Sequence, residues 1–405
     1  MNTEARIANY AAAHEAEITR TLSELIAIPT VNPPGRSYWE CVDYLSGLLQ
    51  SWGVEHRMFS VPHESHPRYS IIGSFGEGED GLHFHGHYDV VVAQSPEQFQ
   101  PRQQDGRLYG RGSSDMKGGI VAMLFALRAI QECGARLSKR ITFALVPDEE
   151  TGGRLGTRHL AEAGLLPRTS FGMLMPEPTS GVIWNACRGA LTLRVRINGR
   201  IAHVGLSQQG VNAFEGMVEV VHSLLALKRS VVARRTAMPI SPPGANRSVM
   251  VLGGESGSGL NFNTVPESAW FSIDRRINPE ESLTQARAEL DQVFEKHRKH
   301  GINIEVEIVQ EGESAVAPTD TRLGQILSQT AKEVTGTLPR FELCPGVLET
   351  RFFTNQGIPA YSYGPGLLEI SHGPHEYVDL SAVLHCTTVY ALTAVRLTER
   401  SSPKR

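Results

Sequence analysis

Cysteine is scarce in this sequence and is not arranged as a framework. Five cysteines occur among 405 residues, far apart from one another and without a Cys-X-X-Cys pair. A disulfide scaffold would use an even, closely spaced set, and a thiolate zinc site would use such pairs. We therefore expect reduced, buried thiols in a cytoplasmic protein. The five residues are Cys41, Cys133, Cys187, Cys344 and Cys386.

Long apolar runs and an excess of one charge are also missing. No stretch of 18 apolar residues occurs, so no membrane span is expected. Lys and Arg number 39 against 43 Asp and Glu, and neither sign forms long runs. This balance argues against nucleic acid or an anionic membrane as a partner. The first 22 residues carry acids throughout, which predicts an amphipathic helix and not a signal peptide.

The length and the change of pattern along the chain predict two domains. A chain of 405 residues suits two domains of about 100 to 200 residues each. Residues 191–198 alternate strictly between apolar and polar side chains, which is typical of an antiparallel sheet with one wet face. Further strands and helices up to about residue 309 give the order β-α-β-β-α-β. We expect an α/β domain with a large mixed sheet (1–187 and 313–405), interrupted by a small α+β, ferredoxin-like domain (188–312).

Three acids follow a buried strand in the segment ITFALVPDEETGG. Six largely apolar residues from Ile141 lead directly into Asp148, Glu149 and Glu150. In open α/β sheets, binding sites form outside the carboxyl ends of such strands. Adjacent carboxylates repel, so a cation beside them would lower the cost of holding them together. A solvated acidic turn remains the simpler interpretation of this segment taken alone.

Other metal-ligating side chains also lie at the expected ends of strands and helices. In LHFHGHYDVV, expected as a strand over 82–91, His87 and Asp89 share a face, and an imidazole ligand commonly donates its second N–H to a carboxylate. His83 and His85 are better explained as structural histidines. Asp115 follows a glycine-rich loop at the expected start of a helix, where an N-cap is the alternative explanation.

The scattered candidates together form a ligand set for two metals. Imidazole and carboxylate ligands suit zinc, cobalt or manganese. Five ligands exceed the three protein ligands of one catalytic zinc, whereas one shared carboxylate would let them serve two metals that activate a water. Glu149 is then left beside the site to take the proton of that water. The five candidates are His87, Asp115, Glu150, Glu177 and His372.

Ten segments between about residues 20 and 390 carry a family resemblance. The chain resembles the dinuclear metal amidohydrolases of the acetylornithine deacetylase, succinyl-diaminopimelate desuccinylase, aminoacylase and carboxypeptidase G superfamily. Each segment is weak alone, but nearly all occur in order and at the correct spacing. The segments are LIAIPTVNPPG, HGHYDVV, YGRGSSDMKGG, PDEETGG, PEPT, RGALTLRVRINGRIAHVG, GVNAF, NTVP, DRRINP and HGPHEYV.

The resemblance implies a metallopeptidase-like catalytic domain and a role for each ligand. It implies two divalent ions per chain, with Zn²⁺ the first choice and Co²⁺ or Mn²⁺ as alternatives. Asp115 would bridge them. His87 and Glu177 would complete the first metal site, and Glu150 and His372 the second.

The resemblance also implies the residues that act on the substrate. Glu149 would be the general base, and Asp89 would orient His87. The inserted domain would be a lid and dimerisation domain whose His203 reaches the site of the partner subunit in a homodimer. Asn263 and Arg276 would contact the substrate.

One segment departs from the family pattern. In GVLETRFF, this chain has Glu349 and Arg351 where many deacylases of the family have an aspartate ahead of the arginine. The segment is expected to line the substrate pocket, so Gly346 and Arg351 are candidate pocket residues. The departure leaves the acyl and amine parts of the substrate open.

These observations predict a cytoplasmic, homodimeric hydrolase acting on an N-acyl amino acid or a similar small N-acylated amine. An exopeptidase, either a dipeptidase or a carboxypeptidase G-like enzyme, is the first alternative. A catalytically silent binding protein on the same fold is the second. The presence of every ligand together with Glu149 argues against the second alternative, because a binder that holds no metal would not need them.

Overall fold

The computed structural model describes residues 2–61 and 66–398, and the chain folds into two compact units. Unit 1 is Met1–Asn185, Ala317–Phe341 and Phe352–Arg405, and unit 2 is Ala186–Val316 and Glu342–Arg351. The boundaries near 186 and 316 lie a few residues from those expected. Residues 342–351 differ from expectation, because they belong to unit 2 and not to the larger domain.

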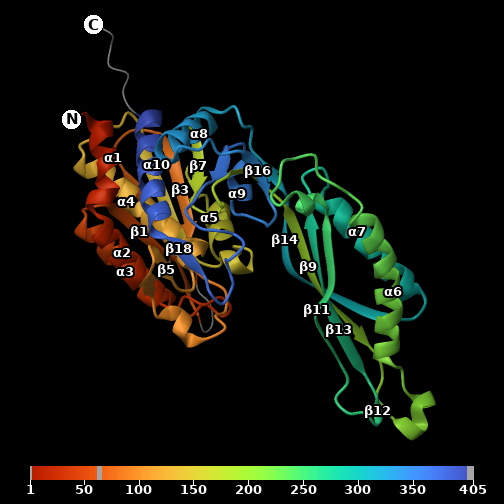
Figure 1. The fold of residues 1–405 in the computed structure, drawn as a ribbon. Helices are drawn as coiled ribbons and strands as arrows, with labels where there is room; N and C mark the ends of the chain where they lie inside the picture. The colour runs from red at the N-terminus through yellow and green to blue at the C-terminus, as the bar shows by residue number, and fades with distance from the viewer. Residues whose placement is uncertain (1, 62–65, 399–405) are drawn as a thin grey trace. The chain divides into compact units, whose positions relative to one another are not determined.

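A mixed sheet forms the centre of unit 1, which confirms the predicted α/β class (Figure 1). The strands run in the order β1-β2-β6-β3-β7-β17-β8, and β3 is parallel to both β6 and β7. The carboxyl ends of these three neighbours therefore meet at one edge of the sheet. The strands are β1 (Glu55–Val61), β2 (Arg68–Phe75), β3 (Asp80–His87), β6 (Arg140–Val146), β7 (Gly172–Met175), β8 (Ile183–Cys187) and β17 (Ala360–Ser362).

Shorter strands complete the sheets. Strand β15 (Ala315–Val316) pairs with the end of β8, and β16 (Phe341–Cys344) also pairs with β8. A separate three-stranded sheet has the order β18-β5-β4. Its strands are β4 (Arg102–Gln104), β5 (Arg107–Tyr109) and β18 (Tyr377–Asp379).

Helices surround the large sheet. The single N-terminal helix expected from the sequence is two helices, because the backbone leaves helical geometry at His14, whose ring stacks on Tyr10. The helices are α1 (Thr3–Ala13), α2 (Glu15–Ala27), α3 (Tyr38–Ser51), α4 (Gly118–Glu132), α5 (Thr157–Glu162), α8 (Arg322–Thr335), α9 (Thr350–Thr354) and α10 (Leu380–Thr398).

Successive side chains of strand β3 face opposite sides of the sheet and pack against different helices. Phe84 packs toward Tyr390 of α10, with ring centroids 5.9 Å apart. His83 and His85 face the opposite side, where both rings lie 5.3 Å from the ring of Phe353 in α9. The two-residue period of a strand therefore puts His87 on the same face as the other two histidines.

Among the described residues, α10 is the one helix long and apolar enough to cross a membrane by length and composition. Most of it is buried inside unit 1, where it packs against α1, α4 and α8. Such burial is typical of a core helix.

Unit 2 is a four-stranded antiparallel sheet in the order β11-β13-β9-β14, with α6 and α7 packed on it (Figure 1). Leu191, Leu193, Val195 and Ile197 of β9 are buried, which confirms the apolar face predicted from their alternation. A short ribbon pairs β10 with β12. The elements are β9 (Gly189–Asn198), β10 (Ala202–His203), α6 (Ala213–Val231), β11 (Val249–Ser258), β12 (Thr264–Val265), β13 (Ser268–Ile277), α7 (Leu283–Lys299) and β14 (Asn303–Gly312).

The first turn of α4 touches the segment after β7, and this contact requires a glycine. A Cβ atom on Gly119 would lie 2.0 Å from the carbonyl oxygen of Pro176. We predict that Gly119→Ala lowers the free energy of unfolding by about 1–3 kcal/mol, because an overpacked core must shift. Urea denaturation of the metal-stripped protein measures this change.

Gly47→Ala is the matched control, because Gly47 is an exposed glycine inside α3 and a Cβ atom added there would meet nothing within 4 Å. It should leave stability unchanged or raise it by about 0.5–1 kcal/mol, the usual helix preference for alanine. Equal effects of the two substitutions would contradict the steric explanation.

Candidate metal centre

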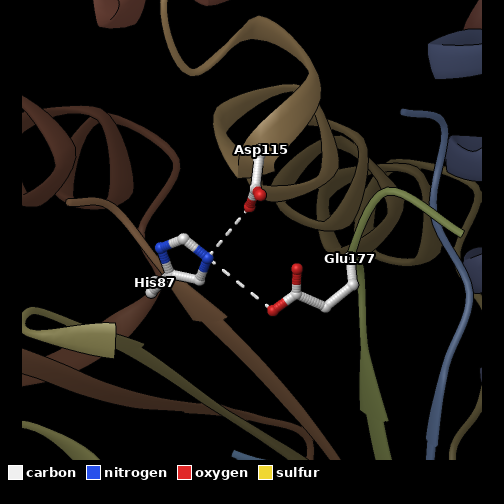
Figure 2. A group of neighbouring side chains, drawn as sticks. All are labelled: His87, Asp115 and Glu177. Carbon is white, nitrogen blue, oxygen red and sulfur yellow. Dashed lines mark ion pairs between the residues drawn. The ribbon is translucent and has the colours of Figure 1, made fainter. Parts of the chain in front are cut away.

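His87 is the last residue of β3 and points its outer ring nitrogen toward two carboxylates (Figure 2). The strand ends here and not at residue 91 as expected. Nε2 of the buried ring lies 3.2 Å from Asp115 Oδ1 and 3.6 Å from Glu177 Oε1. Nδ1 lies 3.1 Å from the carbonyl oxygen of Asp89 and 3.5 Å from its carboxylate. A donor contact at Nδ1 leaves Nε2 as the ligating nitrogen.

Asp115 lies ahead of α4 in the irregular segment Ser113–Lys117, with φ −122° and ψ 99°. The helix begins at Gly118 and its N-cap position is Lys117, so the N-cap explanation of this aspartate is wrong. Because its backbone is extended, the side chain is directed away from the helix and toward His87 (Figure 2).

A second group shares Asp115 with the first. His372 Nε2 lies 3.2 Å from Asp115 Oδ2 and 3.3 Å from Glu150 Oε1. The two oxygens of Asp115 therefore face different histidines, Oδ1 toward His87 and Oδ2 toward His372. The two ligand groups therefore share one carboxylate. This arrangement suits a bridged pair of metal ions.

The buried polar atoms of both groups fit divalent cations. Within the described part of the chain, His87 Nε2, Asp115 Oδ1, Glu150 Oε1 and Glu177 Oε1 are buried and make no hydrogen bond. Burial and the charge of Asp115 raise the pKa of Glu177 well above its usual range, and burial also raises the pKa of Glu150. Such an arrangement is costly unless a cation neutralises it.

The positive charge favoured on His372 also indicates that this place suits a cation. Interaction with Asp115 and Glu150 raises the pKa of His372 to about 11. An imidazolium at this position supplies the positive charge that the two carboxylates attract. A divalent ion would replace that proton, since metal ligands must be deprotonated. The donor set of imidazoles and carboxylates suits Zn²⁺, Co²⁺ or Mn²⁺.

Glu149 and Glu150 lie in the turn that follows β6. Their backbone N–H groups donate to the two oxygens of Asp89, each over 3.2 Å. Asp89 is therefore in contact with both the ring of His87 and the acidic turn. The carboxylate of Glu149 lies outside both ligand groups, although its charge raises the pKa of Glu177.

Several buried polar residues that contact the ligand segments were not predicted from the sequence. Asn32 Nδ2 donates to Asp89 Oδ2 over 2.9 Å and to Asp148 Oδ1 over 3.3 Å. Arg111 and Glu376 form a buried ion pair beside Asp115. Each occurs in a segment already noted, VNPPG, YGRGSSD or HGPHEYV, but polar residues between prolines and glycines are usually assigned to loops.

His83 and His85 are structural, as predicted. His83 Nδ1 lies 2.9 Å from Thr142 Oγ1, and His85 Nε2 lies 2.7 Å from Thr157 Oγ1. The two rings also contact each other through His83 Nε2 and His85 Nδ1, 3.4 Å apart. Both histidines are buried, so these contacts satisfy ring nitrogens that no solvent reaches.

The other predicted site residues lie in unit 2, and they do not form one cluster. Exposed His203 and Asn263 are neighbours, since the N–H of Val204 donates to the Asn263 carbonyl over 3.0 Å. Arg276 is at the other end of β13, where it binds Asp274 through two hydrogen bonds of 2.9 and 3.0 Å.

Gly346 and Arg351 lie in the segment that belongs to unit 2 and not to the large domain. The Gly346 carbonyl accepts from the Arg188 N–H over 2.9 Å, and buried Arg351 donates from Nη1 to the Leu348 carbonyl over 2.7 Å. The structure brings the five ligands, Asp89 and Glu149 together within unit 1. The remaining candidates belong to unit 2, and their roles toward the substrate stay predictions.

Comparisons with known proteins agree with this geometry. The chain is 25% identical over 402 residues to a probable succinyl-diaminopimelate desuccinylase of Staphylococcus epidermidis, covering 93% of this chain and 96% of the relative. It is 26% identical to an acetylornithine deacetylase of Photorhabdus laumondii over 89% of this chain and 92% of that protein. Among solved structures, the fold is similar to that of the dipeptidase Dug1p of Saccharomyces cerevisiae, with TM-score 0.81, 15% identity and 100% coverage of both chains.

The family model for peptidase family M20/M25/M40 matches residues 83–396, a span that contains both ligand groups and the whole of unit 2. The resemblance inferred from the sequence segments is thereby confirmed. One solved structure with a similar fold is that of a Bacillus subtilis protein described as a dinuclear metal-binding peptidase of the M20 family, at 16% identity and TM-score 0.62. This chain belongs to peptidase family M20/M25/M40.

Proposed function

We propose that this protein is a dinuclear metal-dependent amidohydrolase that cleaves the amide bond of an N-acyl amino acid or a similar small N-acylated amine. The observation that carries the proposal is the sharing of Asp115 between two ligand groups, with Glu149 in the adjacent turn. The names of the relatives, a desuccinylase and a deacetylase, support an acylated amine as substrate.

In this mechanism each ligand group would hold one divalent ion, with Zn²⁺ the first choice. Two bound ions would lower the pKa of a water and polarise the substrate carbonyl. Glu149 takes the proton of the attacking water and delivers it to the leaving nitrogen. Asp89 fixes the ring of His87 and, through the Glu149 and Glu150 N–H groups, the turn that carries the base.

We further propose that the enzyme acts as a cytoplasmic homodimer in which His203 serves the site of the partner subunit. His203 and Asn263 lie at one end of the unit 2 sheet, and Arg276 lies at the other end of β13. Strands of this length span about 30 Å at roughly 3.4 Å per residue. One substrate cannot contact both ends in a single chain, so two subunits are needed if both ends bind it.

The substrate class is tested with a panel of acetyl, succinyl and formyl amino acids set against dipeptides. We expect the highest kcat/KM for an N-acyl amino acid and loss of activity after chelation, with recovery on adding Zn²⁺ or Co²⁺. Higher kcat/KM for dipeptides would favour the exopeptidase alternative. That alternative is supported by the fact that Dug1p, which is similar in fold, is a dipeptidase. Full turnover after exhaustive chelation would contradict the metal mechanism.

Glu149→Gln should keep both metal ions and lose about 10² to 10⁴ in kcat, the usual value of general acid–base catalysis. The amide preserves size but cannot carry the proton. Metal content and kcat are measured on the same preparation. Glu162→Gln, which alters an exposed glutamate of α5 paired with Arg158, is the matched control and should change neither. A Glu149→Gln protein that lacks metal would make Glu149 a ligand.

His203→Ala should lower kcat by roughly 10² to 10³, the cost of removing one donor to a developing oxyanion. If His203 acts across the dimer, a heterodimer of Glu149→Ala and His203→Ala has one site with both lesions and one with none. Unfolding, mixing and refolding the two inactive variants should therefore restore activity. No recovery, with heterodimers shown by native mass spectrometry, would place His203 in its own subunit's site or outside the chemistry.

A further inference from the structure

A buried ion pair lies behind the shared ligand Asp115. Arg111 and Glu376 are 1% and 2% exposed, and they pair through Nη1 and Oε2. Neither residue belongs to a ligand group. Burying two opposite charges is costly unless further hydrogen bonds satisfy both groups. In this structure those further bonds go to the two segments that carry Asp115 and His372.

Glu376 holds the backbone of the Asp115 segment. Its Oε1 accepts hydrogen bonds from the N–H groups of Gly112, Ser114 and Asp115, over 3.0, 3.0 and 3.1 Å. Gly112 has φ 83°, which a glycine adopts without strain. Neighbouring backbone N–H groups in such a turn form a concavity that binds an anion. Here the anion is the Glu376 carboxylate, and the bound backbone includes that of Asp115 itself.

Arg111 holds the backbone of His372. Its Nη2 donates to the His372 carbonyl over 3.0 Å and to Gln94 Oε1 over 2.9 Å. Gln94 Nε2 donates to the same carbonyl over 3.1 Å. His372 has φ 65°, a left-handed conformation that is unfavourable for a residue with a Cβ. Such conformations persist where surrounding contacts hold them.

We propose that the Arg111–Glu376 pair positions Asp115 and His372 relative to each other, so that the ion held by Asp115, Glu150 and His372 depends on it. The ion held by His87, Asp115 and Glu177 depends on it less, because the pair contacts only one of its three ligands. His87 ends the paired strand β3 and Glu177 lies two residues after β7. His372 lies outside the named strands and helices. The inference rests on the two-metal site of the proposed function.

Glu376→Gln tests the proposal, because it keeps the shape of the side chain and removes its charge. Chelator-stripped protein is titrated stepwise with Co²⁺, followed by visible absorption and calorimetry. We expect one ion to bind as in the wild type and the other about 10- to 100-fold more weakly, the usual effect of an outer partner of a metal ligand. Gln94→Leu, at an exposed position, should weaken the same ion by a smaller factor.

Asp379→Asn is the matched control. Asp379 pairs with Arg107 over 3.0 Å between the neighbouring strands β18 and β5, but both side chains are about two-fifths exposed and neither contacts a ligand. This variant should bind both ions as the wild type does. Unchanged binding in Glu376→Gln, or equal weakening of both ions, would overturn the proposal.

Two further outcomes are decisive. If Glu376→Gln does not fold, Gln94→Leu decides: selective weakening of one ion supports the proposal, and unchanged or uniform binding overturns it. A wild type that binds a single ion would overturn the two-metal proposal and this inference with it. A wild type that binds two ions, combined with unchanged variants, would overturn this inference alone.

Discussion

The candidate metal centre of unit 1 depends on one carboxylate, that of Asp115, which lies between two histidines. Asp115 presents Oδ1 to His87 and Oδ2 to His372, at 3.2 Å in each case. Glu150 and Glu177 add two more carboxyl groups, whose side chains are 6% and 5% exposed. Because like charges repel and buried charges are costly, bound cations would offset the cost of holding this cluster together. Metal binding at this site would therefore be coupled to local stability.

Sheet topology supplies the geometry that this cluster needs. His87 ends β3, the acidic turn follows β6, and Glu177 follows β7, and these strands are parallel neighbours. Parallel strands bring their carboxyl ends to one edge of the sheet, so residues about 30 to 90 positions apart become adjacent. Asp115 and His372 lie on irregular segments instead. The backbone N–H of Asp115 donates to Glu376, and the backbone carbonyl of His372 accepts from Arg111.

The two units show which features the hydrophobic pattern of the sequence predicts. Strict alternation in β9 identified the buried face of the unit 2 sheet, and the apolar run before Asp148 identified β6. Local features of the termini of elements were harder to predict. Strand β3 stops at His87, and a break at His14 divides the first helix. These ends depend on contacts with distant residues, which hydrophobic periodicity does not contain.

By itself the sequence identified the fold class, the five candidate ligands and the acidic turn with Glu149 and Glu150, because apolar runs, glycine-rich loops and ligand types are local properties of the chain. Only the tertiary structure decided that Asp115 divides its oxygens between two histidines, and that Asp89 supports both His87 and the acidic turn. It also decided that residues 342–351 belong to unit 2 and that Arg111 and Glu376 are buried together. These facts depend on contacts between residues up to 265 positions apart, and no local pattern encodes which of many polar residues will meet.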